Sequence, residues 1–177
     1  MMNETITSTK HIFEGRVIKL DVHEVMLPDG STSQRELVRH PGAVAIVPLD
    51  ADQTIHLVRQ YRIAADRVLL EIPAGTLEPG EDPLVCAERE LQEEISFKPG
   101  KLESLGGIFV APGYTTEYIH LFLATDLKPS SLEMDADEFI ETVTMSLTDA
   151  LKLIETGEIC DSKTTTALMI VARKLGV

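Results

Sequence analysis

A short helix rich in glutamate is the feature of this sequence that most restricts its fold. Asp82 suits a helix N-cap, and Pro83 suits the first helical position, where the missing N–H would have no intrahelical partner anyway. At about 100° per residue, one stripe of the predicted helix is apolar and should face a core. The stripe is made of Leu84, Ala87, Leu91 and Ile95.

The flank beside this stripe carries three carboxylates, Glu90, Glu93 and Glu94. Glu90 and Glu94 are like charges at i and i+4, an arrangement that costs a bare helix a few tenths of a kcal/mol. A bound cation would turn this repulsion into a site, and hard oxygen ligands favour Mg²⁺ or Mn²⁺. Taken alone, three glutamates equally suit a solvated helix face in an acidic protein.

Fixed spacings set this segment apart from an ordinary acidic helix. Five residues separate Gly75 from Glu81, and seven more separate Glu81 from the run Arg89–Glu94. The segment resembles the Nudix box, with Ser96 standing where the family has Gly. Glycine at a helix end usually supplies a left-handed conformation, so we expect Ser96 to strain or alter the exit from the helix without removing a carboxylate.

The composition is that of one ordinary globular domain with room for a short extension. The chain has 177 residues, 44% of them hydrophobic and 25% charged, and no low-complexity tract or internal repeat. A net charge of −13 argues against nonspecific nucleic-acid binding, which needs a basic patch. The dense apolar stretch without a charge near the end of the chain, residues 164–172, is too short to span a membrane and is expected to be a packed helix. The polar start at residues 1–10 shows no signal peptide.

The two cysteines have no metal-binding or redox spacing. We expect Cys86 and Cys160 to be buried free thiols, as in a reducing compartment, and therefore expect a cytoplasmic protein.

The order of the predicted elements indicates a mixed sheet covered by helices on its faces. An Asp-Gly turn at residues 28–30 predicts a hairpin. The predicted strands are 16–27, 34–39, 43–49, 54–61, 102–109, 118–124 and 139–145, and two helices follow at 148–156 and 162–175. The resemblance implies an α/β/α sandwich with an N-terminal β-hairpin subdomain, divided into residues 1–40 and 41–177.

Residues before the box narrow the resemblance to one branch of the family. Gln60-Tyr61-Arg62 and Glu71-Ile72-Pro73-Ala74-Gly75 resemble segments of ADP-ribose pyrophosphatases. A pyrophosphate suits the planar donors of arginine, and Arg62 is the first candidate. The residues alone equally allow Arg59 and Arg62 to solvate a strand edge.

The resemblance also implies roles for the residues of the box. The backbone carbonyl of Ala74 and the carboxylates of Glu90 and Glu94 would ligate a metal. Glu93 would ligate a further metal or accept a hydrogen bond. Arg89 would orient the carboxylates by salt bridges, and Glu81 would hold a water or cap the turn.

Two acidic groups after the box complete the implied site. Glu117 follows a Pro-Gly segment, and in this branch the acidic residue that matches Glu117 helps hold the ribose or the adenine side of the substrate. An ordinary turn between two strands is the alternative. A base that activates water is implied in the loop at residues 132–139, with Glu138 as first choice and Asp137 or Glu133 as substitutes.

The N-terminal residues would complete the site in a second subunit. Phe13 and Arg35 match positions that sandwich adenine in ADP-ribose pyrophosphatases, although Phe13 in a small core and Arg35 on a strand surface is a comparable alternative. This region and the apolar run of the last helix predict a homodimer. The implied reaction is Mg²⁺-dependent hydrolysis of ADP-ribose to AMP and ribose 5-phosphate. The alternatives are hydrolysis of another nucleoside diphosphate sugar and a nucleotide-binding module without activity.

Overall fold

The computed structural model describes residues 2–133 and 138–177. The chain divides into two compact units. One consists of Met1–Gly42 and Phe109–Tyr118, and the other of Ala43–Ile108 and Ile119–Val177. Residues 109–118 lie far along the chain from residues 1–40 and had no part in the predicted extension.

The first unit is an antiparallel three-stranded sheet in the order β1-β2-β3. Its strands are β1 (Thr5–Glu14), β2 (Lys19–Met26) and β3 (Thr32–Arg39). The predicted Asp-Gly hairpin is confirmed between β2 and β3, where the N–H of Gly30 donates to the carbonyl of Leu27 (2.9 Å). The strand predicted from residue 16 begins only at Lys19, and β1 was missed because it is polar and exposed throughout, without an apolar alternation.

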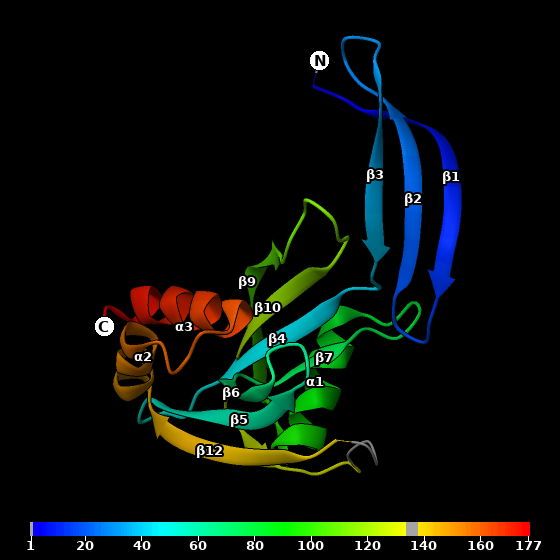
Figure 1. The fold of residues 1–177 in the computed structure, drawn as a ribbon. Helices are drawn as coiled ribbons and strands as arrows, with labels where there is room; N and C mark the ends of the chain where they lie inside the picture. The colour runs from blue at the N-terminus through cyan, green and yellow to red at the C-terminus, as the bar shows by residue number, and fades with distance from the viewer. Residues whose placement is uncertain (1, 134–137) are drawn as a thin grey trace. The chain divides into compact units, whose positions relative to one another are not determined.

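The second unit contains the box helix α1 (Pro83–Glu94) between two sheets (Figure 1). One sheet has the order β7-β4-β10-β9, with β4 and β10 parallel, and the other has the order β12-β5-β6. The strands are β4 (Ala43–Pro48), β5 (Thr54–Arg62), β6 (Arg67–Glu71), β7 (Ala74–Thr76), β9 (Lys101–Phe109), β10 (Tyr118–Thr125) and β12 (Ile140–Ser146), with the short pair β8 (Phe97–Lys98) and β11 (Lys128–Pro129).

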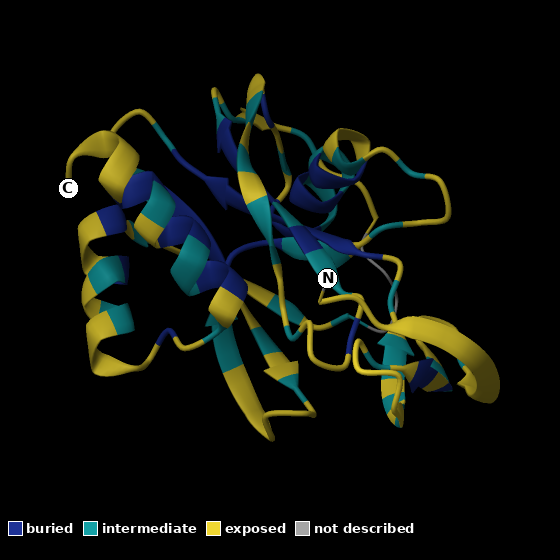
Figure 2. Cartoon of the chain, turned by 90° about the horizontal axis from the view of Figure 1, so that it is seen from above, coloured by how far each residue is buried: buried dark blue, intermediate teal, exposed yellow. Residues whose placement is uncertain are grey.

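Two apolar clusters on opposite faces of β4 and β10 form the core. Along β4, Ala45 and Val47 belong to one cluster and Val44 and Ile46 to the other, as the period of two of a strand requires. The first cluster packs against α2 (Leu147–Thr156) and α3 (Ser162–Leu175), and the second packs against α1. The helix faces turned toward the sheets are buried and the outer faces exposed (Figure 2). The predicted α/β/α sandwich is therefore confirmed.

The structure shows that one residue of the predicted apolar stripe of α1 does not face the core. The N-cap at Asp82 is confirmed, since its side chain accepts a hydrogen bond from the N–H of Leu84. Leu84 itself is 48% exposed, whereas Cys86 is fully buried and takes a place in the core. Leu84 lies in the first turn of the helix, where it lines a surface pocket.

The last helix packs within its own chain. Its apolar run contributes Ala167, Leu168 and Val171 to the core, so this run gives no reason to expect a second subunit. Both late helices end as predicted, at Gly157 and Gly176 in the left-handed conformation. The expectation for the cysteines was half wrong, because Cys160 is exposed and only Cys86 is buried.

Ser96 adopts the left-handed backbone conformation in which glycine is common after the end of a helix. Helix α1 is capped at Ile95, and Ser96 follows with φ of 60°. A side chain in this left-handed region costs about 1–2 kcal/mol. The expected strain is therefore present, and it lies at the exit from the helix, beyond the carboxylates.

Ser96→Gly should stabilise the chain because it removes this strain. The gain should be about 0.5–1 kcal/mol after the entropy of the more flexible unfolded chain is subtracted, or about 1–4 °C in melting temperature. Thermal unfolding followed by circular dichroism measures it. Ser104→Gly, in strand β9, is the matched control and should destabilise. A lower melting temperature for Ser96→Gly would contradict the strain.

Candidate active site

The centre of the site is a pair of buried carboxylates on α1. Glu90 is 7% exposed and Glu94 5% exposed. Burial raises the pKa of Glu90 to about 7, with a further contribution from the charge of Glu93. Burial raises the pKa of Glu94 well above its usual value, and the charges of Glu90 and Glu138 add to this effect. The pair is therefore poorly compensated and suited to a cation.

The turn before the box lies directly against this pair. The N–H of Ala74 donates to Oε2 of Glu94 at 3.2 Å, which places the Ala74 peptide beside the carboxylate. A Cβ on Gly75 would overlap the Glu90 carboxylate. The box glycine is thus explained by close approach, since only a residue without a side chain leaves room for Glu90.

Arg89 holds three of the surrounding carboxylates. Its Nη1 lies 2.8 Å from both Oε1 of Glu90 and Oε2 of Glu93, and its Nε donates to Oε1 of Glu81 at 3.1 Å. Glu81 also accepts from the N–H of Glu78 at 3.0 Å, which fixes the turn. A single guanidinium thus joins the turn to the glutamates of the helix.

Arg62 ends strand β5 and is paired with Glu71 in a bidentate ion pair. Its Nε and Nη2 donate to the two carboxylate oxygens at 3.0 and 2.8 Å. The charge of Arg62 also lowers the pKa of Glu94, so the guanidinium lies within electrostatic reach of the box carboxylates. Glu71, only 1% exposed, had no role in the sequence prediction.

The late acidic loop reaches the same carboxylates through Glu138. Its charge raises the pKa of both Glu90 and Glu94. Another candidate base, Asp137, lies outside the described residues.

Phe13, Arg35 and Glu117 belong to the first unit. Phe13 is 55% exposed, so the alternative of a buried core residue is wrong. Arg35 contacts Glu4, with 2.5 Å between Nη2 and Oε1. The N–H of Glu117 donates to Oγ1 of Thr115 at 3.1 Å, which makes Glu117 part of an ordered turn.

Phe13 and Arg35 of one chain lie on opposite faces of the sheet. Phe13 is opposite Leu20 on β2, and Arg35 is opposite His23 on the same strand. Leu20 and His23 are three residues apart, and side chains alternate between faces along a strand. One chain therefore cannot hold a flat ring between these two side chains.

The donor set around α1 fits a divalent cation. Across the described residues, no three His, Cys, Asp or Glu side chains converge as a ready-made metal cluster. Two buried carboxylates beside a backbone turn remain, and hard cations are commonly held by one or two carboxylates together with substrate phosphates. Glu90, Glu94 and the Ala74 carbonyl are the residues that would hold it.

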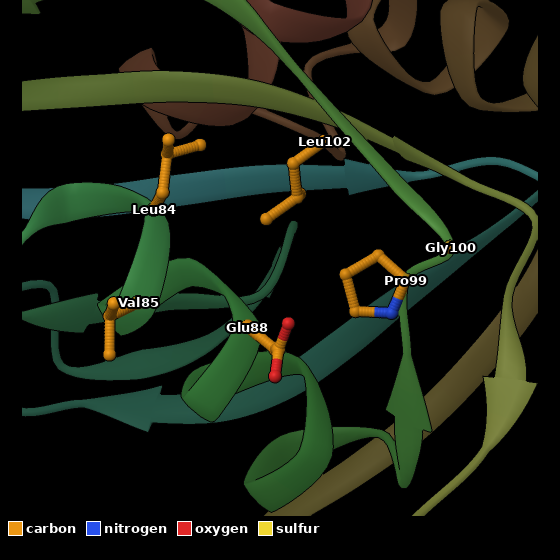
Figure 3. A pocket seen from close by; sticks show the side chains of 6 residues that line it. All are labelled: Leu84, Val85, Glu88, Pro99, Gly100 and Leu102. Carbon is orange, nitrogen blue, oxygen red and sulfur yellow. The ribbon is translucent and has the colours of Figure 1, made fainter.

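A separate pocket of about 360 Å³ lies on the other side of α1 (Figure 3). It is lined by Leu84, Val85, Glu88, Pro99, Gly100 and Leu102. On the helix, the positions of Val85 and Glu88 are turned away from those of Glu90 and Glu94. The pocket therefore has no part in the carboxylate site.

The α/β/α layers and the carboxylate helix define a Nudix-type hydrolase fold, and comparisons agree. The NUDIX domain model matches residues 38–168. An ADP-ribose pyrophosphatase of Bacillus subtilis (strain 168) is 41% identical over 175 residues, covering 98% of this chain and 95% of that protein. A methanol dehydrogenase activator of Bacillus methanolicus is 44% identical over 170 residues, covering 95% and 92%. The crystal structure of an ADP compounds hydrolase matches with a TM-score of 0.87 and 27% identity, covering 98% and 94%.

The chain belongs to the Nudix family and is a Nudix hydrolase. Nudix hydrolases generally need a divalent metal. None of the helices in residues 2–133 and 138–177 has the length and apolar character needed to cross a membrane.

Gly75→Ala should displace the Glu90 carboxylate and weaken metal binding. Overpacking of this kind costs about 1–3 kcal/mol of stability. Metal binding stabilises the folded state by mass action, so the rise in melting temperature on adding Mn²⁺ should shrink in the variant. Gly113→Ala, where a Cβ meets nothing within 4 Å, is the control. A full Mn²⁺-induced shift in Gly75→Ala would show that Glu90 does not depend on this contact.

Proposed function

We propose that this chain hydrolyses the diphosphate of ADP-ribose to AMP and ribose 5-phosphate, with Mg²⁺ as its metal and Mn²⁺ as a substitute. The observation that carries the proposal is the buried pair Glu90 and Glu94 at the Ala74 turn, in a chain 41% identical to an ADP-ribose pyrophosphatase over nearly its full length. The enzyme would be a cytoplasmic homodimer that binds neither nucleic acid nor membranes.

The metal would neutralise the diphosphate and lower the pKa of water. Glu90, Glu94 and the Ala74 carbonyl would hold it, with Glu93 as a further ligand or an acceptor for Arg89. Arg62 would pair with a phosphate oxygen and meet the charge that develops on the phosphoryl group. Water attacks phosphorus as the bridging P–O bond breaks.

Glu138 is the residue that we propose accepts the proton of this water. Its support is the electrostatic influence on both Glu90 and Glu94. Glu138→Gln should lower kcat more than KM, and Glu133→Gln, in the same segment, is the matched control. Equally small effects of the two changes would show that another residue is the base, and Glu93 is the next candidate.

Two other activities have support among the relatives. A GDP-mannose pyrophosphatase of Klebsiella pneumoniae is 32% identical over 159 residues, so another nucleoside diphosphate sugar is the nearest alternative substrate. The Bacillus methanolicus relative is named for activation of methanol dehydrogenase, so an effect on such an enzyme is a second candidate function. The intact glutamates of the box disfavour a binding module without activity.

Hydrolysis should require a divalent metal and prefer ADP-ribose over GDP-mannose, UDP-glucose and NADH. Excess chelator should abolish turnover, and Mg²⁺ or Mn²⁺ should restore it. Glu94→Gln should lower kcat by orders of magnitude, because it removes a charged ligand while keeping the shape of the side chain. Steady-state formation of the nucleoside monophosphate, which is AMP in the case of ADP-ribose, measures these effects.

The matched control for Glu94→Gln is Glu88→Gln, on the same helix, where Glu88 pairs with Lys98 at 2.6 Å. Its kcat should remain near that of the unchanged protein. Full activity in excess chelator would refute the metal assignment. A higher kcat/KM for GDP-mannose than for ADP-ribose would show that the alternative substrate, another nucleoside diphosphate sugar, is the preferred one.

If Phe13 and Arg35 both stack on adenine, they must come from different subunits, because the two lie on opposite faces of one sheet. A mixture of the two single variants should therefore recover binding sites that neither variant has alone. Stacking on a base contributes about 1–3 kcal/mol, so Phe13→Ala and Arg35→Ala should each raise KM for ADP-ribose about tenfold. In mixed dimers one site regains both side chains, and after random exchange about one site in four should bind as in the unchanged protein.

Titration of tight ADP-ribose sites in the mixture measures this recovery, and either variant alone is the control. Light scattering tests the dimer itself. A dimer whose mixture shows no recovery would contradict a stack shared between subunits, and an active monomer would contradict the shared site altogether.

A further inference from the structure

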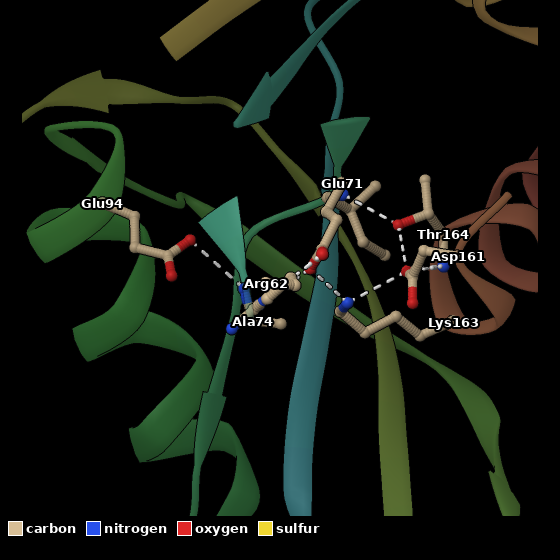
Figure 4. A network of polar contacts seen from close by, with 8 residues as sticks. Arg62, Glu71, Ala74, Glu94, Asp161, Lys163 and Thr164 are labelled. Carbon is tan, nitrogen blue, oxygen red and sulfur yellow. Dashed lines mark hydrogen bonds and ion pairs between the residues drawn. The ribbon is translucent and has the colours of Figure 1, made fainter. Parts of the chain in front are cut away.

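Four side chains of alternating charge form a row from the start of α3 to Arg62 at the end of β5 (Figure 4). Nζ of Lys163 lies 2.9 Å from Oδ2 of Asp161 and 2.5 Å from Oε2 of Glu71. Glu71 in turn holds Nε and Nη2 of Arg62. The row thus runs from Asp161 through Lys163 and Glu71 to Arg62.

Burial makes the middle of this row costly to disturb. Glu71 is 1% exposed and Lys163 8% exposed. Lysine is rarely buried unless it is paired, and removing one partner of a buried pair leaves an uncompensated charge. Burial alone would raise the pKa of Glu71, but the hydrogen bond from Arg62 and the charge of Lys163 hold it below its usual value. Lys163 and Arg62 thus share one buried anion.

A second connection runs from α3 to the turn before the box. Oγ1 of Thr164 accepts from the N–H of Ile72 at 3.0 Å and donates to Oδ2 of Asp161 at 2.6 Å. Ile72 is two residues before Ala74, whose N–H donates to Glu94. The first turn of α3 therefore supports both Arg62 and the segment beside the carboxylates.

The contacts of Arg62 leave part of its guanidinium for a ligand. Glu71 engages Nε and Nη2, and within the described residues Nη1 has no hydrogen-bond partner. The side chain of Arg62 is 40% exposed, although the Glu71 carboxylate that it binds is buried. A guanidinium fixed on one edge and open on the other is arranged to receive a phosphate oxygen.

We propose that Lys163 is a positioning residue which, by fixing Glu71 from α3, holds Arg62 in the orientation that receives the substrate diphosphate. This inference rests on the proposed function of the same site. Glu71 paired with Arg62 alone would follow the arginine as it moves. Lys163 ties Oε2 of Glu71 to the first turn of a helix that is itself fixed in the core by Ala167, Leu168 and Val171. The arginine then needs no reordering when a substrate binds.

A purely structural role of Lys163 makes a different prediction. It would lower stability without altering Arg62, and its effect on substrate binding would add to that of an Arg62 variant. A positioning role requires that the effect vanish once Arg62 is gone. The two roles are therefore separated by a spectroscopic signal of Arg62 and by a double-mutant cycle.

The first measurement needs no substrate. In ¹⁵N NMR spectra the Nε–H of Arg62, assigned by its absence in Arg62→Ala, should give a signal protected from exchange. Lys163→Met should broaden or lose this signal, and Lys163→Arg should retain it. Lys174→Met is the matched control, because Lys174 is on the same helix and pairs with Glu103 at 2.5 Å near the surface. Lys163→Gln replaces Lys163→Met if the latter does not fold.

The second measurement is a double-mutant cycle of Lys163 and Arg62, in which the KM for ADP-ribose is compared among the variants. Lys163→Met should raise KM about tenfold with a smaller change in kcat, and should have no further effect in the Arg62→Ala background. An unchanged Nε–H signal, or effects on KM that multiply, would overturn the inference. If the unchanged protein does not hydrolyse ADP-ribose, the proposed function fails, and the NMR signal still decides the role of Lys163.

Discussion

The surrounding structure is arranged around one constraint, which is that the carboxylates of Glu90 and Glu94 are both buried and lie close together. Burial and mutual repulsion both disfavour their charged forms, as the raised pKa values show. The surroundings answer this cost in three ways: Arg89 binds Glu90 from one side, the Ala74 N–H binds Glu94 from the other, and Gly75 leaves the space that Glu90 fills. A divalent cation would supply the remaining positive charge.

Local chemistry made much of this fold predictable from the sequence. The N-cap at Asp82, the hairpin turn at Gly30 and the buried run of β4 each follow from a few neighbouring residues, and all are present. The errors also have local causes. β1 was missed because an exposed polar strand has no apolar period, and Leu84 was misplaced because a helix end projects beyond the core it packs on.

The site was predictable only where its residues are neighbours along the chain. The box places its glutamates by helical spacing, so their positions on one flank follow from the sequence. The contact of Lys163 with Glu71 joins residues 92 positions apart, and no spacing rule reaches that far. Arg62 shows the intermediate case: its type suggested a phosphate ligand, but its bidentate pairing with Glu71 appears only in the fold. The two roles are compatible, because a guanidinium has five donors.

The proposed function assigns chemistry and substrate choice to different parts of the chain. In that proposal any nucleoside diphosphate would offer the same diphosphate to the carboxylates and to Arg62, so these residues could not select a base. Phe13 and Arg35 have the exposure and chemistry to do so, yet β2 separates their strands and the register sends them to opposite faces. A base held between two such side chains needs them from different chains. If these residues select adenine, the specificity of the enzyme is therefore a property of its dimer and not of the single fold.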